Sequence, residues 1–238
     1  MGKKKFLISE QDLTDLILKS LIGSKDSKGI LDTFLSTTKP NQTDTSSSPS
    51  SNIDTKTNLN VPTGEFPVMN LNNPAEYETY KSIADKFIST RKHNLLGITG
   101  SMLADGAKNA QTKYGRYVPV ELALSQLAAE GGFDKNPSSR PIRTKNPFNV
   151  GNVNSGKNIF HNTVQSGIQA YFDLIARSYL TDTTSGADLI KNFVNKRGLR
   201  YATGGKYEAL VGQIANQVKN IASPIYATLS KKISTDLT

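Results

Sequence analysis

Glu130 is the residue of this sequence best placed to act as an acid or a base. It follows the nearly all-apolar residues 118–129 and precedes Gly131 and Gly132. A helix that is apolar on most faces is buried, so a carboxylate in its last turn lies at the edge of a core. Burial and the carbonyl end of the helix raise the pKa of such a group toward the range of a general acid. The glycines leave room for a ligand, although Glu130 could instead be only a capping or paired carboxylate.

The composition excludes several other kinds of catalytic site. The chain has no cysteine, which removes a thiolate zinc site, a disulfide framework and a cysteine nucleophile. Its two histidines, His93 and His161, are not spaced as zinc ligands, so a zinc peptidase or amidase lacks its ligand set. We therefore expect neither a metal ion nor a cofactor.

The net charge of +9 is concentrated in the second half of the chain, because residues 139–238 carry 13 basic and 5 acidic side chains. A basic surface suits a polyanion, either nucleic acid or an anionic cell-wall polymer, or is simply a solvated face. The cations are not interleaved with aromatic residues as in a nucleic-acid stacking platform, so nucleic acid is the less favoured partner. No apolar run is long enough for a membrane span.

The chain divides into four parts by composition. Residues 1–22 include a predicted amphipathic helix at 8–22, which docks either on a partner protein or back on its own domain. Residues 23–72 are rich in Ser, Thr, Asn and Pro and are predicted to form a linker. Residues 73–222 are the predicted folded domain, and residues 223–238 a C-terminal tail.

Apolar periodicity predicts a mainly α domain. The expected helices are residues 74–92, with Asn73, Pro74 and Glu76 forming a capping box, then 98–113, 118–130, 163–180, 185–196 and 206–221. Gly115 and Gly198 are expected to end two of these helices, and Pro224 interrupts the last pattern. Residues 136–161 are rich in Pro, Asn and Gly, which predicts a small irregular or β-hairpin lobe.

Three groups of residues occur in an order that is typical of one enzyme family. They are Tyr114-Gly115 and Val118-Pro119 with Leu124-Ser125-Gln126-Leu127-Ala128-Ala129-Glu130-Gly131-Gly132-Phe133, then Asn146-Pro147-Phe148-Asn149-Val150-Gly151, then Tyr201-Ala202-Thr203-Gly204-Gly205-Lys206-Tyr207. This set resembles the lysozyme-like N-acetylglucosaminidases of glycoside hydrolase family 73, which include flagellar and phage wall hydrolases. The resemblance covers about residues 80–221. It implies a lysozyme-like helical domain preceded by the N-terminal helix and the long linker.

The resemblance also implies roles for individual residues. Glu130 would be the general acid that protonates the glycosidic oxygen, and Tyr201 would lie in the cleft beside the scissile sugar. The implied substrate-binding residues are Asn146, Phe148, Asn149 and Phe133. An aromatic ring at position 148 could stack on a sugar face, but it could equally belong to the core of the lobe.

The sequence departs from the family pattern in its acidic residues. Gly204 replaces the acid that usually follows the Tyr-Ala-Thr triplet, and residues 146–161 contain no Asp or Glu. Glycoside hydrolysis normally uses a second carboxylate. Asp134 and Asp173 are the candidates, with Asp134 just past the catalytic helix. Without one, the N-acetyl group or the 6-hydroxyl of the substrate could attack the anomeric carbon while Glu130 acts first as acid and then as base.

Three functions follow from these observations. The first is a peptidoglycan hydrolase that cleaves glycan strands, as an N-acetylglucosaminidase or a lytic transglycosylase. Residues 8–22 and the linker would attach it to a phage virion tail. It would act in the periplasm or cell wall during genome entry. The second is an inactive lysozyme-like structural or wall-binding virion protein. The third is a basic nucleic-acid-binding protein.

Overall fold

The computed structural model describes residues 65–152, 158–202 and 206–236 of the chain. Within these ranges the elements are α3 (Pro74–Ser89), α4 (Gly100–Tyr114), α5 (Val120–Ala129), α6 (Arg140–Thr144), α7 (Val164–Leu174), the π-helical segment η1 (Ile175–Tyr179), α8 (Gly186–Lys191) and α9 (Tyr207–Asp236). The described residues form no strand, only an isolated bridge between Val194 and Arg200. The predicted mainly α class is confirmed. The helix predicted at residues 8–22 and most of the linker lie outside the described ranges.

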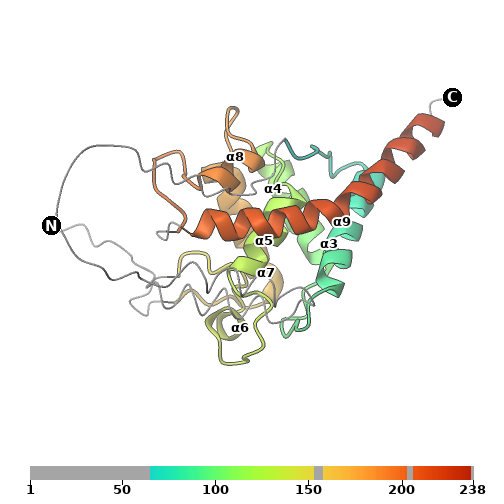
Figure 1. Ribbon diagram of the computed structural model, residues 1–238. Coiled ribbons are helices and arrows are strands. Elements are labelled where there is room, and N and C mark those ends of the chain that lie inside the picture. The colour runs from blue at the N-terminus through green and yellow to red at the C-terminus, as the bar shows by residue number, and fades with distance from the viewer. Residues whose placement is uncertain (1–64, 153–157, 203–205, 237–238) are drawn as a thin grey trace, which may run out of the picture.

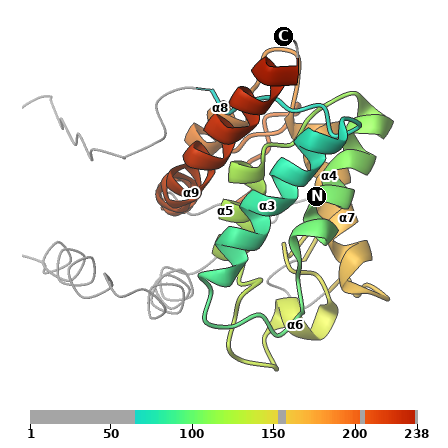
Figure 2. The same ribbon diagram turned by 90° about the vertical axis from the view of Figure 1, so that its right-hand side faces the viewer.

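The helix α5 lies at the centre of the domain. It packs mainly against α9 and also against α3 and α8, while α4 packs between α3 and α7 (Figures 1 and 2). All ten residues of α5 are buried, which confirms the buried helix predicted from the apolar run. Since α5 has no solvent-facing side, every polar group on it must find its partner inside the domain.

The start of α3 shows which capping signals operate. Asn73 Oδ1 accepts a hydrogen bond from Ala75 N at 2.9 Å, and Pro74 is the first helical residue, as predicted. The predicted capping box is wrong, because Glu76 Oε2 accepts instead from Asn70 N at 2.6 Å. The segment before the helix turns back toward Glu76 and supplies a nearer donor.

The folded part begins before residue 73. Phe66, Met69 and Leu71 are buried, and the side chain of Gln111 on α4 bonds both Leu71 N at 2.8 Å and Met69 O at 2.7 Å. Residues 66–71 include four apolar side chains, Phe66, Val68, Met69 and Leu71, but the polar composition of residues 23–72 as a whole favoured a linker. Residues 65–72 therefore belong with the domain rather than with the linker.

The helix α9 continues through Pro224 without ending, so the predicted break there is wrong. Proline removes one helical hydrogen bond. Beyond it, Ile225 and Tyr226 still pack against the core, and Thr228 Oγ1 donates to Pro224 O at 3.0 Å. These contacts extend the helix past the position where the local pattern weakens. Its C-terminal end projects beyond the other helices (Figure 1).

Three other helices follow the sequence pattern to different extents. The predicted helix at 163–180 is present as α7 continued by η1, and Gly115, at φ 66°, ends α4 as expected. The helix predicted at 185–196 is shorter and ends at Lys191, after which Asn192 is extended and the buried Phe193 enters the core. The helix ends here because the extended backbone at Asn192 lets the Phe193 ring enter the core.

Residues 131–163 form a lobe that contains the short helix α6. Before the gap, residues 147–151 lie largely in turns, and after it residues 158–161 have no regular secondary structure, so the hairpin alternative is wrong for this part of the lobe. Asn146 holds its tightest turn, since its side chain donates to Val150 O at 2.9 Å and accepts from Val150 N at 3.0 Å. Asparagine side chains thus supply the hydrogen bonds that a hairpin would have supplied.

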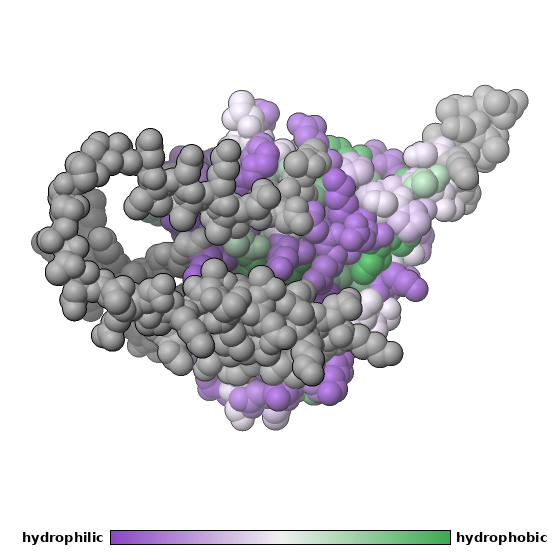
Figure 3. Space-filling model, viewed as in Figure 1, coloured by the Kyte–Doolittle hydropathy of each residue, from purple (hydrophilic) through white to green (hydrophobic). Residues whose placement is uncertain are grey.

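The surface of the domain is mostly polar on the face of Figure 3, where the coloured residues are predominantly hydrophilic and small hydrophobic areas lie toward the end from which α9 projects. In the part of the chain that the structure describes, no helix has the length and apolar character needed to cross a membrane.

Candidate active site

Glu130 is the C-cap residue of α5 and the first residue of that helix region to be partly exposed. Gly131 follows in the left-handed region at φ 83°, a conformation that favours glycine. A Cβ on Gly132 would lie 2.4 Å from Leu127 Cδ1, so the chain can fold this closely over the helix end only without a side chain. The two glycines therefore turn the chain away and leave the Glu130 side chain at the boundary between core and solvent.

Two groups from distant segments contact the Glu130 side chain. Tyr207 OH, in the first turn of α9, donates to Glu130 Oε1 at 2.7 Å. Asn149 Nδ2, in the lobe, donates to Glu130 O at 2.9 Å and lies 3.4 Å from Glu130 Oε2. One carboxylate oxygen is thus firmly bonded, whereas the other has a single long contact.

Burial raises the pKa of Glu130 from 4.5 to about 7. Desolvation of the charged carboxylate is the largest cause, and it outweighs the hydrogen bonds from Tyr207 and Asn149 and the positive charge of Arg140, which all act to lower the pKa. A carboxyl group with this pKa holds its proton for part of the time near neutrality and can release it, which a general acid requires.

A buried hydrogen-bonded chain extends from Glu130 into the core. Gln126 Nε2 donates to Tyr207 OH at 3.0 Å, and Tyr171 OH donates to Gln126 Oε1 at 2.6 Å. Neither Gln126 nor Tyr171 was identified as a site residue from the sequence. Gln126 lies four residues before Glu130 and so on the same helix face, which is the one local signal of their connection.

Tyr201 lies beside the site but does not bond the carboxylate. Its hydroxyl donates to Phe148 O at 3.0 Å, and its ring stacks on that of Tyr207 with centroids 5.9 Å apart. Burial, followed by the nearby charge of Glu130, raises the pKa of Tyr201 well above its ordinary value. The tyrosine that contacts Glu130 is Tyr207, which was not among the site residues predicted from the sequence. The place of Tyr201 beside the scissile sugar stays a prediction.

Two of the predicted substrate-binding residues are part of the core. Phe148 is fully buried, with its ring stacked on Tyr171 at a centroid distance of 3.7 Å. Asn146 is also fully buried and is committed to the backbone of Val150. Stacking on a sugar requires an exposed ring face, so the sugar-binding role predicted for Phe148 is wrong in this structure. Both residues shape the lobe from inside.

The other two predicted substrate-binding residues are partly exposed. Asn149 adopts φ 52° and reaches the end of α5, where it contacts Glu130. Phe133 packs against the core with an edge contact to Phe87 at a centroid distance of 6.3 Å. Asn149 is therefore the predicted substrate-binding residue that the fold places in direct contact with the candidate acid.

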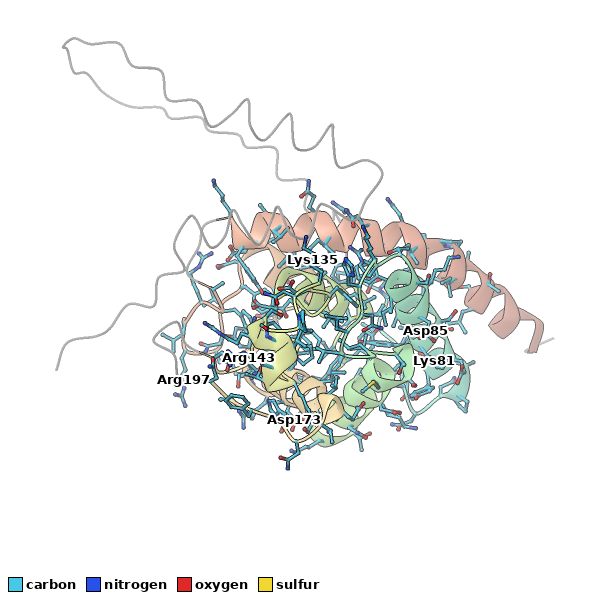
Figure 4. The ribbon with its side chains drawn as sticks, turned by 90° about the horizontal axis from the view of Figure 1, so that it is seen from below. Lys81, Asp85, Lys135, Arg143, Asp173 and Arg197 are labelled. Atoms are coloured by element: carbon cyan, nitrogen blue, oxygen red, sulfur yellow. The ribbon has the colours of Figure 1, made fainter. Side chains whose placement is uncertain are left out.

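The candidate second carboxylates have other partners. Asp134 Oδ1 accepts from Asn136 N at 3.0 Å, and Asp134 is not among the groups that shift the pKa of Glu130. Asp173 lies on α7, where it pairs with Lys113 at 3.2 Å, and Figure 4 shows it well apart from Lys135, the neighbour of Asp134. The sequence has no Asp or Glu between these two positions. The described residues therefore bring no second carboxylate into contact with Glu130.

A second buried carboxylate lies in the first turn of α5. Glu121 is fully buried and accepts a hydrogen bond from Tyr226 OH of α9 at 2.9 Å. Its Oε2 atom and the hydroxyls of Tyr80 and Tyr117 are buried without a hydrogen-bond partner among the described residues. Burial raises the pKa of Glu121 above its ordinary value. Glu121 was not among the site residues predicted from the sequence.

The comparisons with known proteins add no relative. No protein-family profile matches the chain, and neither the curated proteins nor the solved structures include a significant match. Among the described residues no three His, Asp or Glu side chains gather as a metal site would need. The inference of function therefore depends on the geometry around Glu130 and on the sequence motifs.

Proposed function

We propose that this protein cleaves the glycan strands of peptidoglycan, with Glu130 as the general acid. The observation that carries the proposal is the state of Glu130, a partly exposed carboxyl group with a pKa of about 7 at the end of a buried helix. The order of the motifs around residues 114–133, 146–151 and 201–207 supports the substrate class, through the resemblance to lysozyme-like N-acetylglucosaminidases.

In the proposed reaction Glu130 protonates the glycosidic oxygen as the bond to the anomeric carbon breaks. We place the attacking group on the substrate itself, as either its N-acetyl oxygen or its 6-hydroxyl, because residues 146–161 contain no Asp or Glu and Asp134 is hydrogen-bonded within its own turn. Glu130, now ionised, then accepts a proton from water or from the 6-hydroxyl and is ready for another cycle. The first route gives a reducing sugar and the second an anhydro-sugar.

The N-terminal part of the chain suggests the setting. A predicted amphipathic helix at residues 8–22, joined through a polar linker, is the arrangement expected for a domain carried by a larger assembly. We place this domain in a phage virion tail, where local opening of the wall would accompany genome entry.

The test is digestion of purified peptidoglycan followed by mass spectrometry of the released fragments. Wild-type protein should release fragments with reducing or anhydro ends, and Glu130→Gln should release none above background while keeping its fold by circular dichroism. Undiminished release by Glu130→Gln would refute the role of Glu130. The mass of the new ends separates the two routes.

The missing second carboxylate favours one alternative, a lysozyme-like domain that binds wall glycan without cleaving it. In this case wild-type protein and Glu130→Gln should sediment equally with insoluble peptidoglycan, and neither should release fragments. Sedimentation combined with product analysis therefore separates binding from cleavage in one experiment.

A further inference from the structure

The hydrogen-bonded chain behind Glu130 has a defined direction. The contact of 2.6 Å between Tyr171 OH and Gln126 Oε1 is a distance typical of O–H···O bonds, whereas the 3.0 Å between Gln126 Nε2 and Tyr207 OH is typical of N–H···O bonds. The amide of Gln126 is therefore oriented with its oxygen toward Tyr171. The reverse orientation would also leave the Tyr171 hydroxyl without an acceptor in this contact.

This direction determines what Tyr207 can do. An amide nitrogen only donates, so the Tyr207 oxygen must accept from Gln126, and its single hydrogen has Glu130 Oε1 as its acceptor at 2.7 Å. Because Oε1 already accepts this hydrogen bond, the carboxyl proton is less stable on Oε1 than on Oε2. Among the described residues, the contact of Glu130 Oε2 that is known is the 3.4 Å one to Asn149, so no shorter hydrogen bond from them competes for this oxygen.

We infer that Tyr171, Gln126 and Tyr207 form a directional relay that keeps the proton of Glu130 on Oε2, the oxygen beside Asn149. Gln126 and Tyr171 are then positioning residues, which act on the acid without touching a ligand. In terms of the proposed function, on which this use of the site rests, Oε2 is the atom that delivers the proton to the glycosidic oxygen. The location of the proton itself does not depend on any activity.

One cation and three buried tyrosines also act electrostatically on the Glu130 carboxyl group. Arg140 contributes a positive charge that lowers the pKa of Glu130, and the buried hydroxyls of Tyr201, Tyr207 and Tyr171 have pKa values raised by burial, with a further contribution from the charge of Glu130. These tyrosines stay protonated and act as donors. Glu130 is consequently the group of this cluster that titrates near neutrality.

The relay makes a prediction about a residue that does not touch Glu130. In Tyr171→Phe the amide of Gln126 is free to reverse and present its oxygen to Tyr207, whose hydroxyl then turns away from Glu130. The ionised carboxylate loses a donor, so the pKa of Glu130 should rise by about half a pH unit. Tyr207→Phe removes the donor directly and should raise the same pKa by about one unit.

The experiment is a pH titration of full-length protein with carbon-13 in the glutamate carboxyl groups, followed by NMR, with the Glu130 resonance assigned by its absence in Glu130→Gln. Tyr80→Phe is the matched control, because it removes a fully buried hydroxyl that is not part of the relay. A rise in Tyr171→Phe and none in Tyr80→Phe supports the relay. An unchanged pKa in Tyr171→Phe, together with a rise in Tyr207→Phe, overturns it and leaves Tyr207 acting alone.

If Tyr171→Phe does not fold, another variant tests the same relay. Gln126→Met removes the link between the two tyrosines with a side chain of similar volume. The loss of the Gln126 donor weakens the Tyr207 hydroxyl as a donor, although Tyr207 keeps Glu130 Oε1 as its acceptor. The relay therefore predicts a smaller rise in the pKa of Glu130 than in Tyr207→Phe, and an unchanged pKa would contradict it. Because the readout is a titration, a protein that shifts as predicted but does not cleave peptidoglycan refutes only the proposed function.

Discussion

The two carboxylates of the α5 region form a natural comparison, because the same two helices hold both. Glu121 accepts a hydrogen bond from Tyr226 at 2.9 Å, and Glu130 accepts one from Tyr207 at 2.7 Å, with both tyrosines on α9. Burial raises the pKa of each carboxyl group. By these measures alone the two glutamates are equivalent.

They differ in access. Glu121 is fully buried, whereas Glu130 is partly exposed, ends its helix and is followed by the turn at Gly131. A raised pKa marks both structural and functional carboxylates, so it cannot by itself identify a catalytic acid. The route to solvent makes Glu130 the candidate and leaves Glu121 as a buried link between α5 and α9.

The largest expected effect separates the two glutamates by activity. Glu130→Gln should lower the rate of glycan cleavage by roughly 10²- to 10⁴-fold, the usual contribution of a general acid. Glu121→Gln replaces a fully buried side chain by one of the same shape, so its rate of glycan cleavage should stay within about threefold of that of wild type. The measurement is the release of soluble fragments from peptidoglycan. Equal losses of activity in both variants would show that activity depends on having a carboxyl group at each buried position, and not specifically on an acid at position 130.

The next effect is on the pH dependence of stability. The pKa of Glu130 rises from 4.5 to about 7 on folding, so between these values the folded protein binds more protons than the unfolded chain. The free energy of unfolding therefore falls as the pH rises from 4.5 to 7 and levels off above 7. Glu130→Gln has no carboxyl group to ionise, so its free energy of unfolding does not fall in this way. It should be more stable than wild type by roughly 1–3 kcal/mol at pH 8, with little difference at pH 4.

Urea unfolding across this pH range tests the prediction. The exposed Glu78→Gln is a suitable control, since its side chain is 66% exposed, and its curve should run parallel to that of wild type. Glu121→Gln should change the curve in the same direction as Glu130→Gln, because burial raises that pKa as well. A curve for Glu130→Gln that parallels wild type would mean that Glu130 is not held in its protonated form.

A smaller effect is expected at the turn that distinguishes Glu130. Gly131→Ala forces alanine into the left-handed region and should cost about 1 kcal/mol of stability, together with about a tenfold loss of activity as the acid is displaced. Gly115→Ala is the matched control, because Gly115 also has a positive φ with no atom near its absent Cβ. It should lose similar stability and keep its activity. Loss of activity in both would point to general destabilisation.

The smallest effect is expected at Asp134. If Glu130 works without a protein-derived second carboxylate, Asp134→Asn should change the cleavage rate by less than about threefold, because this side chain caps a turn at Asn136. A loss of roughly 100-fold or more would instead identify Asp134 as the second catalytic group.

Several features of the fold could be predicted because their causes are local. The apolar run before Glu130 indicated a buried helix, Asn73 and Pro74 marked a helix start, and Gly115 marked a helix end. Capping and amphipathicity depend on residues a few positions apart, which a sequence displays directly. The length of α9 was missed because contacts with distant residues outweighed Pro224.

The sequence by itself determined that a carboxylate closes a buried helix and that residues 146–161 contain no acidic residue. Only the tertiary structure decided which groups meet this carboxylate. Tyr207 lies 77 positions from Glu130, and Tyr226 lies 105 positions from Glu121. Such contacts depend on how α9 packs along α5, and no local pattern encodes that packing. The same packing buries one glutamate completely and leaves the other partly exposed.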